Sequence, residues 1–168
     1  MEIANCKIVH LTSSHDFSCF ECGDSDLDDF IKTDSFEYQQ KMIARTFVLM
    51  RKNEAIGFHS VTMDSLKKKR ILTSEEFDIT NYPALKIARL AVDKTCHKHG
   101  YGELLLLHAI RLAQRLEGDV GCRLVTVDSK KEAVDFYIKH NFKLINNSET
   151  QTYPTLYLDL LTLQKVAN

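Results

Sequence analysis

The fold is decided by residues 90–116, which read LAVDKTCHKHGYGELLLLHAIRLAQRL. An apolar run from Leu85 to Val92 predicts a strand, and the periodic stretch from Glu103 to Leu116 predicts a helix. Gly100 and Gly102 stand in the turn between them, where the backbone can approach a ligand closely and the unpaired amides of the first helical turn can bind an anion. This indicates a phosphate-binding turn, although two glycines before a helix are equally typical of simple packing.

Further elements are predicted on both sides of this stretch, and their order defines the fold class. Strands alternate with helices, and two of the strands are close enough to form a hairpin. We therefore expect an α/β (α+β) fold, with one domain over residues 1–168 and a mixed, mostly antiparallel sheet flanked by helices. The other predicted strands are Lys7–Leu11, Arg45–Arg51, Ala55–Met63, Arg123–Val127, Phe142–Ile145 and Thr155–Leu160, and the other predicted helices are Leu27–Met42, capped by Ser25 or Asp26, and Lys131–His140.

The charge balance argues against a general nucleic-acid-binding protein. The 168 residues include 22 Lys and Arg against 23 Asp and Glu, a net charge of -1. The charges are segregated, however, because acidic residues gather between His15 and Glu37 and basic residues between Gln39 and Arg70. The even total therefore leaves room for one basic face.

Cysteine usage and hydropathy predict a cytoplasmic protein with no membrane contact. Five cysteines is an odd number, and the N-terminus lacks the pattern of a secretory signal, so we expect reduced thiols. No apolar run approaches the roughly 18 residues of a membrane span. Cys19 and Cys22 have the spacing of metal ligands, but no second Cys or His pair completes a tetrahedral site, and no metal is expected.

The glycine turn fits neither common nucleotide-binding motif. No Gly-Lys-Ser/Thr follows it, and Leu105 stands where a dinucleotide motif would need its third glycine. The segment instead resembles the GNAT superfamily of acyl-CoA-dependent N-acyltransferases, whose Gln/Arg-x-x-Gly-x-Gly/Ala signature follows a strand ending in hydrophobic-Ala-Val-Asp. The corresponding residues here are Leu90-Ala91-Val92-Asp93 and His97-Lys98-His99-Gly100-Tyr101-Gly102.

This resemblance implies acetyl-CoA as the cofactor. The backbone of Leu90, Ala91 and Val92 would pair with the pantetheine arm, and residues 97–102 would hold the pyrophosphate. His97 replaces the usual Gln or Arg, which puts its side-chain contact in question and leaves the backbone amides untouched.

The resemblance continues downstream and implies a general acid. Residues 133–137 read AVDFY, and the family places a catalytic tyrosine where Tyr137 stands. This hydroxyl would protonate the departing thiolate, whereas its place in an apolar stripe is equally compatible with a core tyrosine. Asn141 follows where the family usually has glycine, and asparagine keeps the left-handed helix stop.

Other polar residues have no assigned role. Asp64, Asp93 and His59 are candidates for the general base, but a chain of water molecules would serve as well, and none is assigned. Arg89 lies inside a predicted strand, where it would hold either a substrate phosphate or an internal carboxylate.

The acceptor amine is not identified, but we expect a small-molecule or protein amine, with aminoacyl-tRNA as the alternative. Near-neutral charge favours a small-molecule or protein amine, whereas the N-terminal pattern, with FECG at 20–23 and LDDF at 27–30, resembles the branch that includes toxin acetyltransferases of aminoacyl-tRNA. In that branch the basic residues 67–70, which otherwise indicate a solvated loop, would contribute to a surface for tRNA. An antitoxin and a second copy of the chain are then candidate partners. A non-catalytic CoA-binding module is the alternative from another class, and the presence of Tyr137 argues against it.

Overall fold

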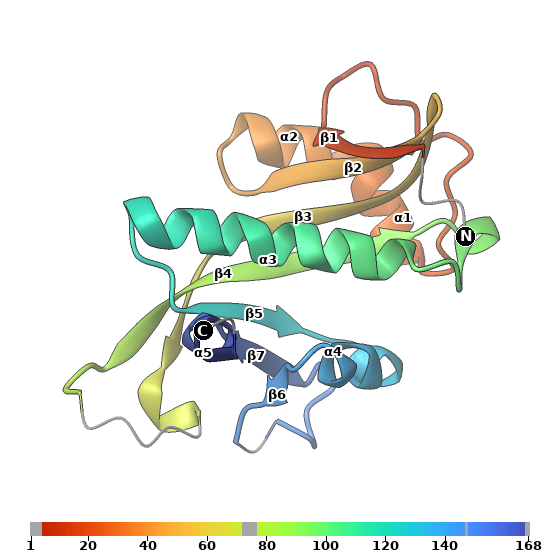
Figure 1. Ribbon diagram of the computed structural model, residues 1–168. Coiled ribbons are helices and arrows are strands. Elements are labelled where there is room, and N and C mark those ends of the chain that lie inside the picture. Colours follow the sequence, from red (N-terminus) through yellow and green to blue (C-terminus); the bar gives the residue numbers. More distant parts are fainter. Residues whose placement is uncertain (1–4, 72–76, 147, 167–168) are drawn as a thin grey trace. The chain divides into compact units, whose positions relative to one another are not determined.

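The strands form one mixed sheet, which confirms the predicted fold class. A computed structural model of the chain describes residues 5–71, 77–146 and 148–166. Its strands are β1 (Cys6–His10), β2 (Arg45–Arg51), β3 (Glu54–Lys67), β4 (Asn81–Val92), β5 (Leu124–Asp128), β6 (Lys143–Leu144) and β7 (Thr155–Asp159). They lie in the order β1-β2-β3-β4-β5-β7-β6 (Figure 1). β4 and β5 are parallel, whereas β1 with β2, β2 with β3, β5 with β7 and β6 with β7 are antiparallel.

The chain divides into two compact units by its internal contacts. The first unit comprises residues 1–62 and 88–109, and the second comprises residues 63–87 and 110–168. The long helix α3 (Tyr101–Asp119) begins in the first unit and ends in the second.

The first helical segment of the chain runs from Ser25 to Gln40 in three parts. These are α1 (Ser25–Asp29), the π-helical turn η1 (Phe30–Asp34) and α2 (Ser35–Gln40). The prediction that Ser25 or Asp26 caps this segment is wrong. Asp24 is the cap, because its backbone is extended and its Oδ1 accepts hydrogen bonds from the amides of Asp26 and Leu27 at 3.1 and 3.4 Å. A carboxylate in this place also faces the positive end of the helix dipole.

The predicted hairpin of the first unit is confirmed. Arg51 of β2 pairs with Glu54 of β3 across a two-residue turn, in which Lys52 has a φ of 58°. β3 continues to Lys67, further than the alternation of apolar residues in the sequence indicates.

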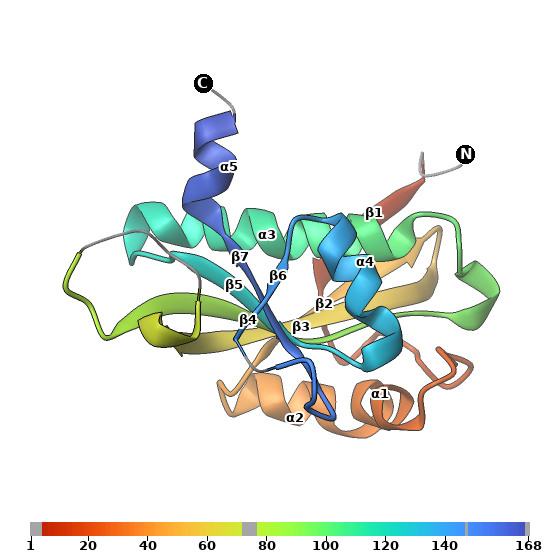
Figure 2. The same cartoon turned by 90° about the horizontal axis from the view of Figure 1, so that it is seen from below.

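The first unit has an apolar core on each face of its strands. On one face Phe30 packs with Phe58 of β3 and Ala91 of β4. On the other face Leu49 of β2 packs with Leu105 of α3. Figure 2 shows α1 and α2 on the side of these strands opposite to α3.

The second unit packs β5, β6 and β7 with η4 (Lys131–Ala133), α4 (Val134–Lys139) and α5 (Leu160–Val166). Its core includes Leu66, Tyr82, Ala84, Leu124, Ile145 and Tyr157. α5 begins where the sequence predicts the end of a strand. Asp159 explains this end, because its Oδ1 accepts hydrogen bonds from the Leu161 amide at 3.0 Å and from Nε of Arg123 at 2.6 Å. Within the described ranges, no helix is long and apolar enough to cross a membrane.

Candidate active site

The turn that joins β4 to α3 has the backbone geometry of an anion-binding loop. Lys98 and Gly100 have φ angles of 65° and 84°, and α3 begins directly after them at Tyr101. Glycine adopts this conformation without strain, and the amides of the first helical turn have no acceptor within their helix. These amides and the positive end of a 19-residue helix fit a negatively charged phosphate. The loop therefore suits the pyrophosphate of a CoA-type cofactor.

The side chain of His97 connects the loop to the end of β4. Its Nε2 donates a hydrogen bond to the backbone oxygen of Val92, the last residue of β4, at 2.8 Å. Nδ1 of His99 donates in the same way to the backbone oxygen of His97 at 2.7 Å. The residue that replaces the usual Gln or Arg thus supports the turn through its side chain.

The end of β4 leaves backbone available beyond its pairing with β5. The paired register of the two strands ends at Ile87 and Val127, whereas β4 continues to Val92. Along this extension Ala91 packs in the core of one face, and Leu90 and Val92 pack against the core of the other. The side chains of residues 90–92 are therefore engaged in packing, and only their backbone is suited to bind a ligand.

Gly57 of β3 is a feature of this region that the sequence does not single out. A Cβ atom at Gly57 would lie 3.0 Å from the backbone oxygen of Ala91 and 3.1 Å from Cδ1 of Leu105. The absence of a side chain therefore lets β4 and α3 pack closely against β3 in the first unit, next to the residues predicted to bind the cofactor.

Tyr137 belongs to the second unit, where it lies on α4. Only 6% of its surface is exposed, and its ring contacts Phe136 and Phe142, with centroids 5.1 and 5.5 Å away. Burial raises the pKa of its hydroxyl well above the ordinary value of 10. No described residue forms a hydrogen bond with this hydroxyl. Tyr137 therefore retains its proton at neutral pH, as a general acid must. Asn141, with a φ of 66°, ends the helix as expected.

Two of the three candidates for the general base, Asp64 and Asp93, form hydrogen bonds with neighbouring residues. Asp64 accepts hydrogen bonds from the Thr126 hydroxyl at 2.6 Å and the Ser65 amide at 2.8 Å. Asp93 caps η3 (Lys94–Cys96). Its partial burial raises the pKa, but hydrogen bonds, first from the Thr95 side chain, hold the carboxyl below its usual range. Both carboxylates thus serve the local structure.

His59, the third candidate, lies entirely within the first unit. It is fully buried, and burial together with the charge of neighbouring His108 lowers its pKa to about 3. No general base is assigned from these three residues.

Arg89 has aromatic neighbours instead of an internal carboxylate. Its guanidinium carbon lies 3.7 Å from the ring centroid of Phe30 and 5.6 Å from that of Tyr38. No carboxylate of a described residue forms an ion pair with it. Of the two roles expected for Arg89, the internal ion pair is therefore absent among the described residues. The sequence does not reveal Phe30 and Tyr38 as neighbours of Arg89.

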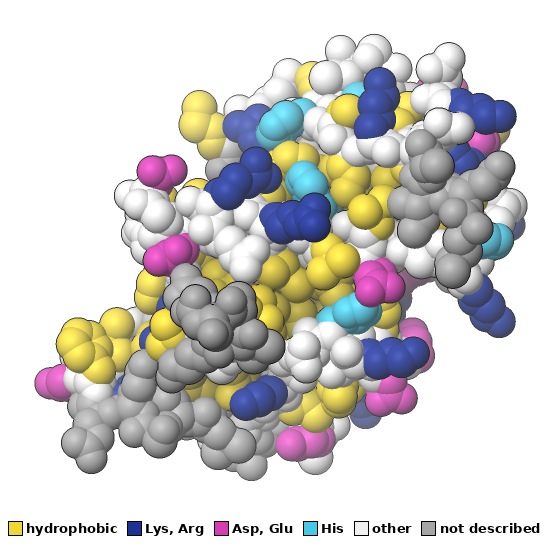
Figure 3. Space-filling model, viewed as in Figure 1, with side chains coloured by type: hydrophobic (Ala, Val, Ile, Leu, Met, Phe, Trp, Pro, Cys, Tyr) yellow, Lys and Arg dark blue, Asp and Glu magenta, His cyan; other side chains and the backbone are white. Residues whose placement is uncertain are grey.

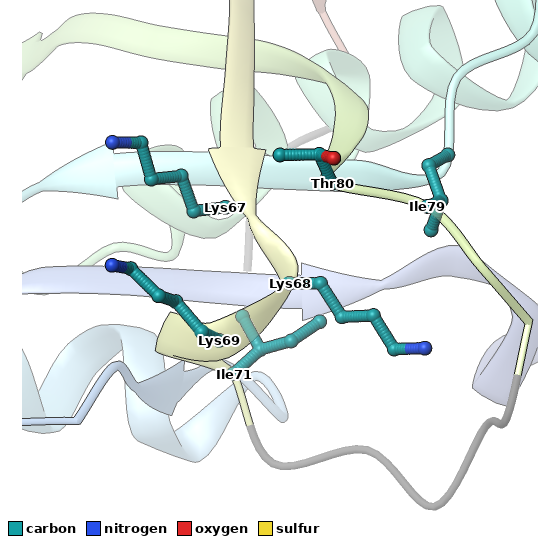
Figure 4. A pocket seen from close by; sticks show the side chains of 6 residues that line it. All are labelled: Lys67, Lys68, Lys69, Ile71, Ile79 and Thr80. Carbon is teal, nitrogen blue, oxygen red and sulfur yellow. The ribbon is translucent and has the colours of Figure 1, made fainter.

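The basic segment of the second unit lines a pocket. Figure 4 shows Lys67 and Lys69 extending to one side and Lys68 to the other, in a pocket that Ile71, Ile79 and Thr80 complete. Nζ of Lys68 donates a hydrogen bond to the Phe77 backbone oxygen at 2.5 Å. The face drawn in Figure 3 carries Lys and Arg side chains as well as acidic and apolar ones.

Residues 43–144 match the family model of the acetyltransferase (GNAT) domain. This match spans more than half of the chain. The chain belongs to the GNAT family of acetyltransferases.

Relatives of this chain include toxins that act on tRNA. A tRNA-acetylating toxin of Mycobacterium tuberculosis is 25% identical over 159 residues, which cover 94% of this chain and 91% of that protein. The structure of AtaT complexed with acetyl-methionyl-tRNAfMet has a TM-score of 0.89 at 19% identity, covering 97% of this chain and 99% of that one. A tyrosine-to-phenylalanine mutant of KacT has a TM-score of 0.87 at 20% identity, covering 96% and 99%. The likeness to these two structures establishes the fold.

Proposed function

We propose that the chain transfers the acetyl group of acetyl-CoA to the free amine of an aminoacyl-tRNA. The similarity to the mycobacterial tRNA-acetylating toxin over 94% of the chain carries this proposal. The net charge of -1 favours a small amine instead, but a total charge does not describe the surface around one site. The similarity along the whole chain therefore weighs more than the charge.

The residues that we propose to bind the cofactor all belong to the first unit. Bound acetyl-CoA supplies an activated acetyl thioester, and a structure of AtaTR was solved with AcCoA bound. The amides of Lys98 to Gly102 hold the pyrophosphate through the positive φ of Gly100 and the start of α3. The backbone of Leu90, Ala91 and Val92 orients the pantetheine arm as an added strand. His97 maintains the turn through its bond to the oxygen of Val92.

The chemical step uses the hydroxyl of Tyr137. The neutral acceptor amine forms a C–N bond with the acetyl carbon and loses its surplus proton to water, while the C–S bond breaks and the sulfur leaves as a thiolate that needs a proton. Tyr137 is protonated at neutral pH, and it donates the proton to the sulfur. We propose that residues 1–168 act as one catalytic domain.

A protein antitoxin is the proposed partner. A structural neighbour at 20% identity, a mutant of the toxin AtaT, was solved bound to the C-terminus of the antitoxin AtaR. The exposed apolar residues Phe36, Met42 and Ile43 of the first unit are suited to contact with another protein chain, either an antitoxin or a second copy.

A small-molecule or protein amine is the second candidate acceptor, favoured by the net charge of -1. Labelled acetyl-CoA offered with aminoacyl-tRNA, polyamines or peptides distinguishes the acceptors, and deacylated tRNA is the matched control. We expect label in aminoacyl-tRNA and none in deacylated tRNA. Label in a polyamine or peptide, without label in aminoacyl-tRNA, would reject the proposed acceptor.

A further inference from the structure

Arg89 is a half-buried cation whose donors are unused within the described part of the chain. Its side chain lies between solvent and the apolar core of the first unit. The guanidinium carbon is 3.7 Å from the Phe30 centroid, so the ring lies against the guanidinium. Among the described residues its side chain has no hydrogen bond and no ion pair. A charge withdrawn from water without a partner is unfavourable unless a ligand completes its environment.

The aromatic neighbours fix Arg89 without occupying its donors. Phe30 is 3% exposed, and its ring meets Tyr38 edge to face, with centroids 5.5 Å apart and planes at 89°. A guanidinium carries its five N–H donors within its own plane, and contact with a ring face leaves them available. Such a preorganised fork matches two oxygens of one phosphate or carboxylate.

The acidic residues on the neighbouring helical segment do not serve this role. Asp24 caps α1, and Asp28 accepts a hydrogen bond from the amide of Cys22 at 2.8 Å. Asp29, next to Phe30, forms no ion pair with Arg89. An anion that completes the Arg89 environment would therefore have to come from outside the described part of the chain.

The position of Arg89 along β4 indicates that an anion bound there would belong to the acceptor and not to the cofactor. The proposed pyrophosphate loop follows Val92, so a cofactor paired with residues 90–92 would extend back along the strand, with its acetyl end towards Arg89. Arg89 and Ala91, two residues apart, share the sheet face on which Phe30 packs. Arg89 is thus placed beyond the acetyl end, on the side of α1 and α2, away from the cofactor phosphates.

We propose that Arg89 binds a phosphate of the aminoacyl-tRNA 3′ end and positions the amine for transfer. This inference rests on the proposed function, because it takes the acceptor to be a nucleic acid. Arg89 is then a specificity-determining residue, since an acceptor without an anionic group near its amine gains nothing from the fork.

Two variants of Arg89 and one control test this role through the kinetics of acetyl transfer. Arg89→Met keeps an unbranched side chain that packs on an aromatic ring but has no donors, and Arg89→Lys keeps the charge without the planar fork. Arg111→Met is the matched control, because Arg111 is an exposed arginine on α3. Thermal unfolding checks that all three proteins are folded.

We expect Arg89→Met to raise the KM for aminoacyl-tRNA by about tenfold or more, since charge-assisted hydrogen bonds to a phosphate are lost. The KM for acetyl-CoA should stay within about twofold of the wild-type value. The slope of log(kcat/KM) against log salt concentration should become shallower by roughly the contribution of one phosphate contact. Arg89→Lys should fall between Arg89→Met and the wild type, and Arg111→Met should resemble the wild type. An unchanged KM and salt slope in a folded, active Arg89→Met protein would overturn the role of Arg89.

A second measurement separates this inference from the choice of acceptor. Inorganic phosphate, added to the wild-type protein, should shift the NMR signal of the Arg89 Nε–H in a saturable way. The signals of Arg111 should stay in place. If the wild type fails to acetylate aminoacyl-tRNA yet shows this shift, the acceptor is wrong and Arg89 binds the anion of another acceptor. The absence of any shift would reject the anion site itself.

Discussion

The rings of His59 and His108 form a hydrogen bond, with Nε2 of His59 2.8 Å from Nδ1 of His108. His59 is fully buried and lies parallel to the ring of Phe47, with centroids 5.0 Å apart. Its Nδ1 has no hydrogen-bond partner among the residues that the structure describes. Desolvation and then the charge of His108 lower the pKa of His59 from 6.5 to about 3, so His59 is neutral in the folded protein at neutral pH.

This pair predicts a loss of stability in mild acid. The unfolded chain binds a proton at His59 below about pH 6.5, whereas the folded chain does not bind it until about pH 3. The contribution of His59 to stability is therefore complete above pH 6.5 and is lost as the pH falls from 6.5 towards 3. The loss reaches about 1.4 kcal/mol per pH unit.

Urea unfolding at several pH values measures this effect. His59→Gln should lower the stability at pH 7. Below pH 6 it should also flatten the dependence of the unfolding free energy on pH, because about one proton fewer is taken up on unfolding. The same substitution at exposed His99 is the control. An identical slope in His59→Gln and the wild type would show that His59 is protonated in the folded state.

Removal of the Tyr137 hydroxyl should affect the chemical step alone. Tyr137→Phe keeps the ring packed against Phe136 and Phe142 and should lower kcat by about 10²–10⁴-fold. Calorimetry should give the same affinity for acetyl-CoA as in the wild type. Tyr153→Phe, at a tyrosine that is 51% exposed, should leave kcat unchanged. Normal turnover in Tyr137→Phe would show that Tyr137 only packs in the core and has no catalytic role.

Negative charge at the start of α3 should prevent cofactor binding. Gly102→Asp places a carboxylate in the first turn of the helix, where it competes with the pyrophosphate for the same amides. Gly102→Ala adds a methyl group without charge, and we expect it to retain more affinity than Gly102→Asp in calorimetry with acetyl-CoA. If Gly102→Asp binds acetyl-CoA with wild-type affinity, the pyrophosphate does not bind at this loop.

Close packing at Gly57 should make even a methyl group unfavourable. In Gly57→Ala the new Cβ would meet the Ala91 oxygen at 3.0 Å, and we expect a destabilisation of about 1–3 kcal/mol. Gly118→Ala provides a contrast, because nothing lies within 4 Å of its Cβ and alanine favours the helix by up to about 1 kcal/mol. Equal stabilities in urea would contradict the close approach of β4 to β3.

The sequence predicts local elements better than contacts between distant residues. β2 is predicted residue for residue, and the left-handed stop at Asn141 is confirmed, because both depend on neighbours in the chain. The environment of Arg89 is not predictable in this way, since Phe30 and Tyr38 reach it from a helical segment 51 to 59 residues earlier. The His59–His108 pair is hidden for the same reason.

Two boundaries were also beyond local reasoning. Asp24 competes with Ser25 and Asp26 as a helix cap, and only the extended backbone at Asp24 decides between them. α5 follows β7 because Asp159 binds both Arg123 and the amide of Leu161. The cofactor residues and Tyr137 come from a family motif, and their roles stay predictions.

The identity of the acceptor is tested most directly in growing cells. RNA extracted from cells that express the wild-type chain, and from cells that express Tyr137→Phe, is analysed by mass spectrometry for N-acetylated aminoacyl groups. We predict acetylated aminoacyl-tRNA and arrested growth with the wild type, and neither with Tyr137→Phe. Normal growth with unmodified aminoacyl-tRNA, together with acetylation of a polyamine or peptide by the purified protein, would contradict the account.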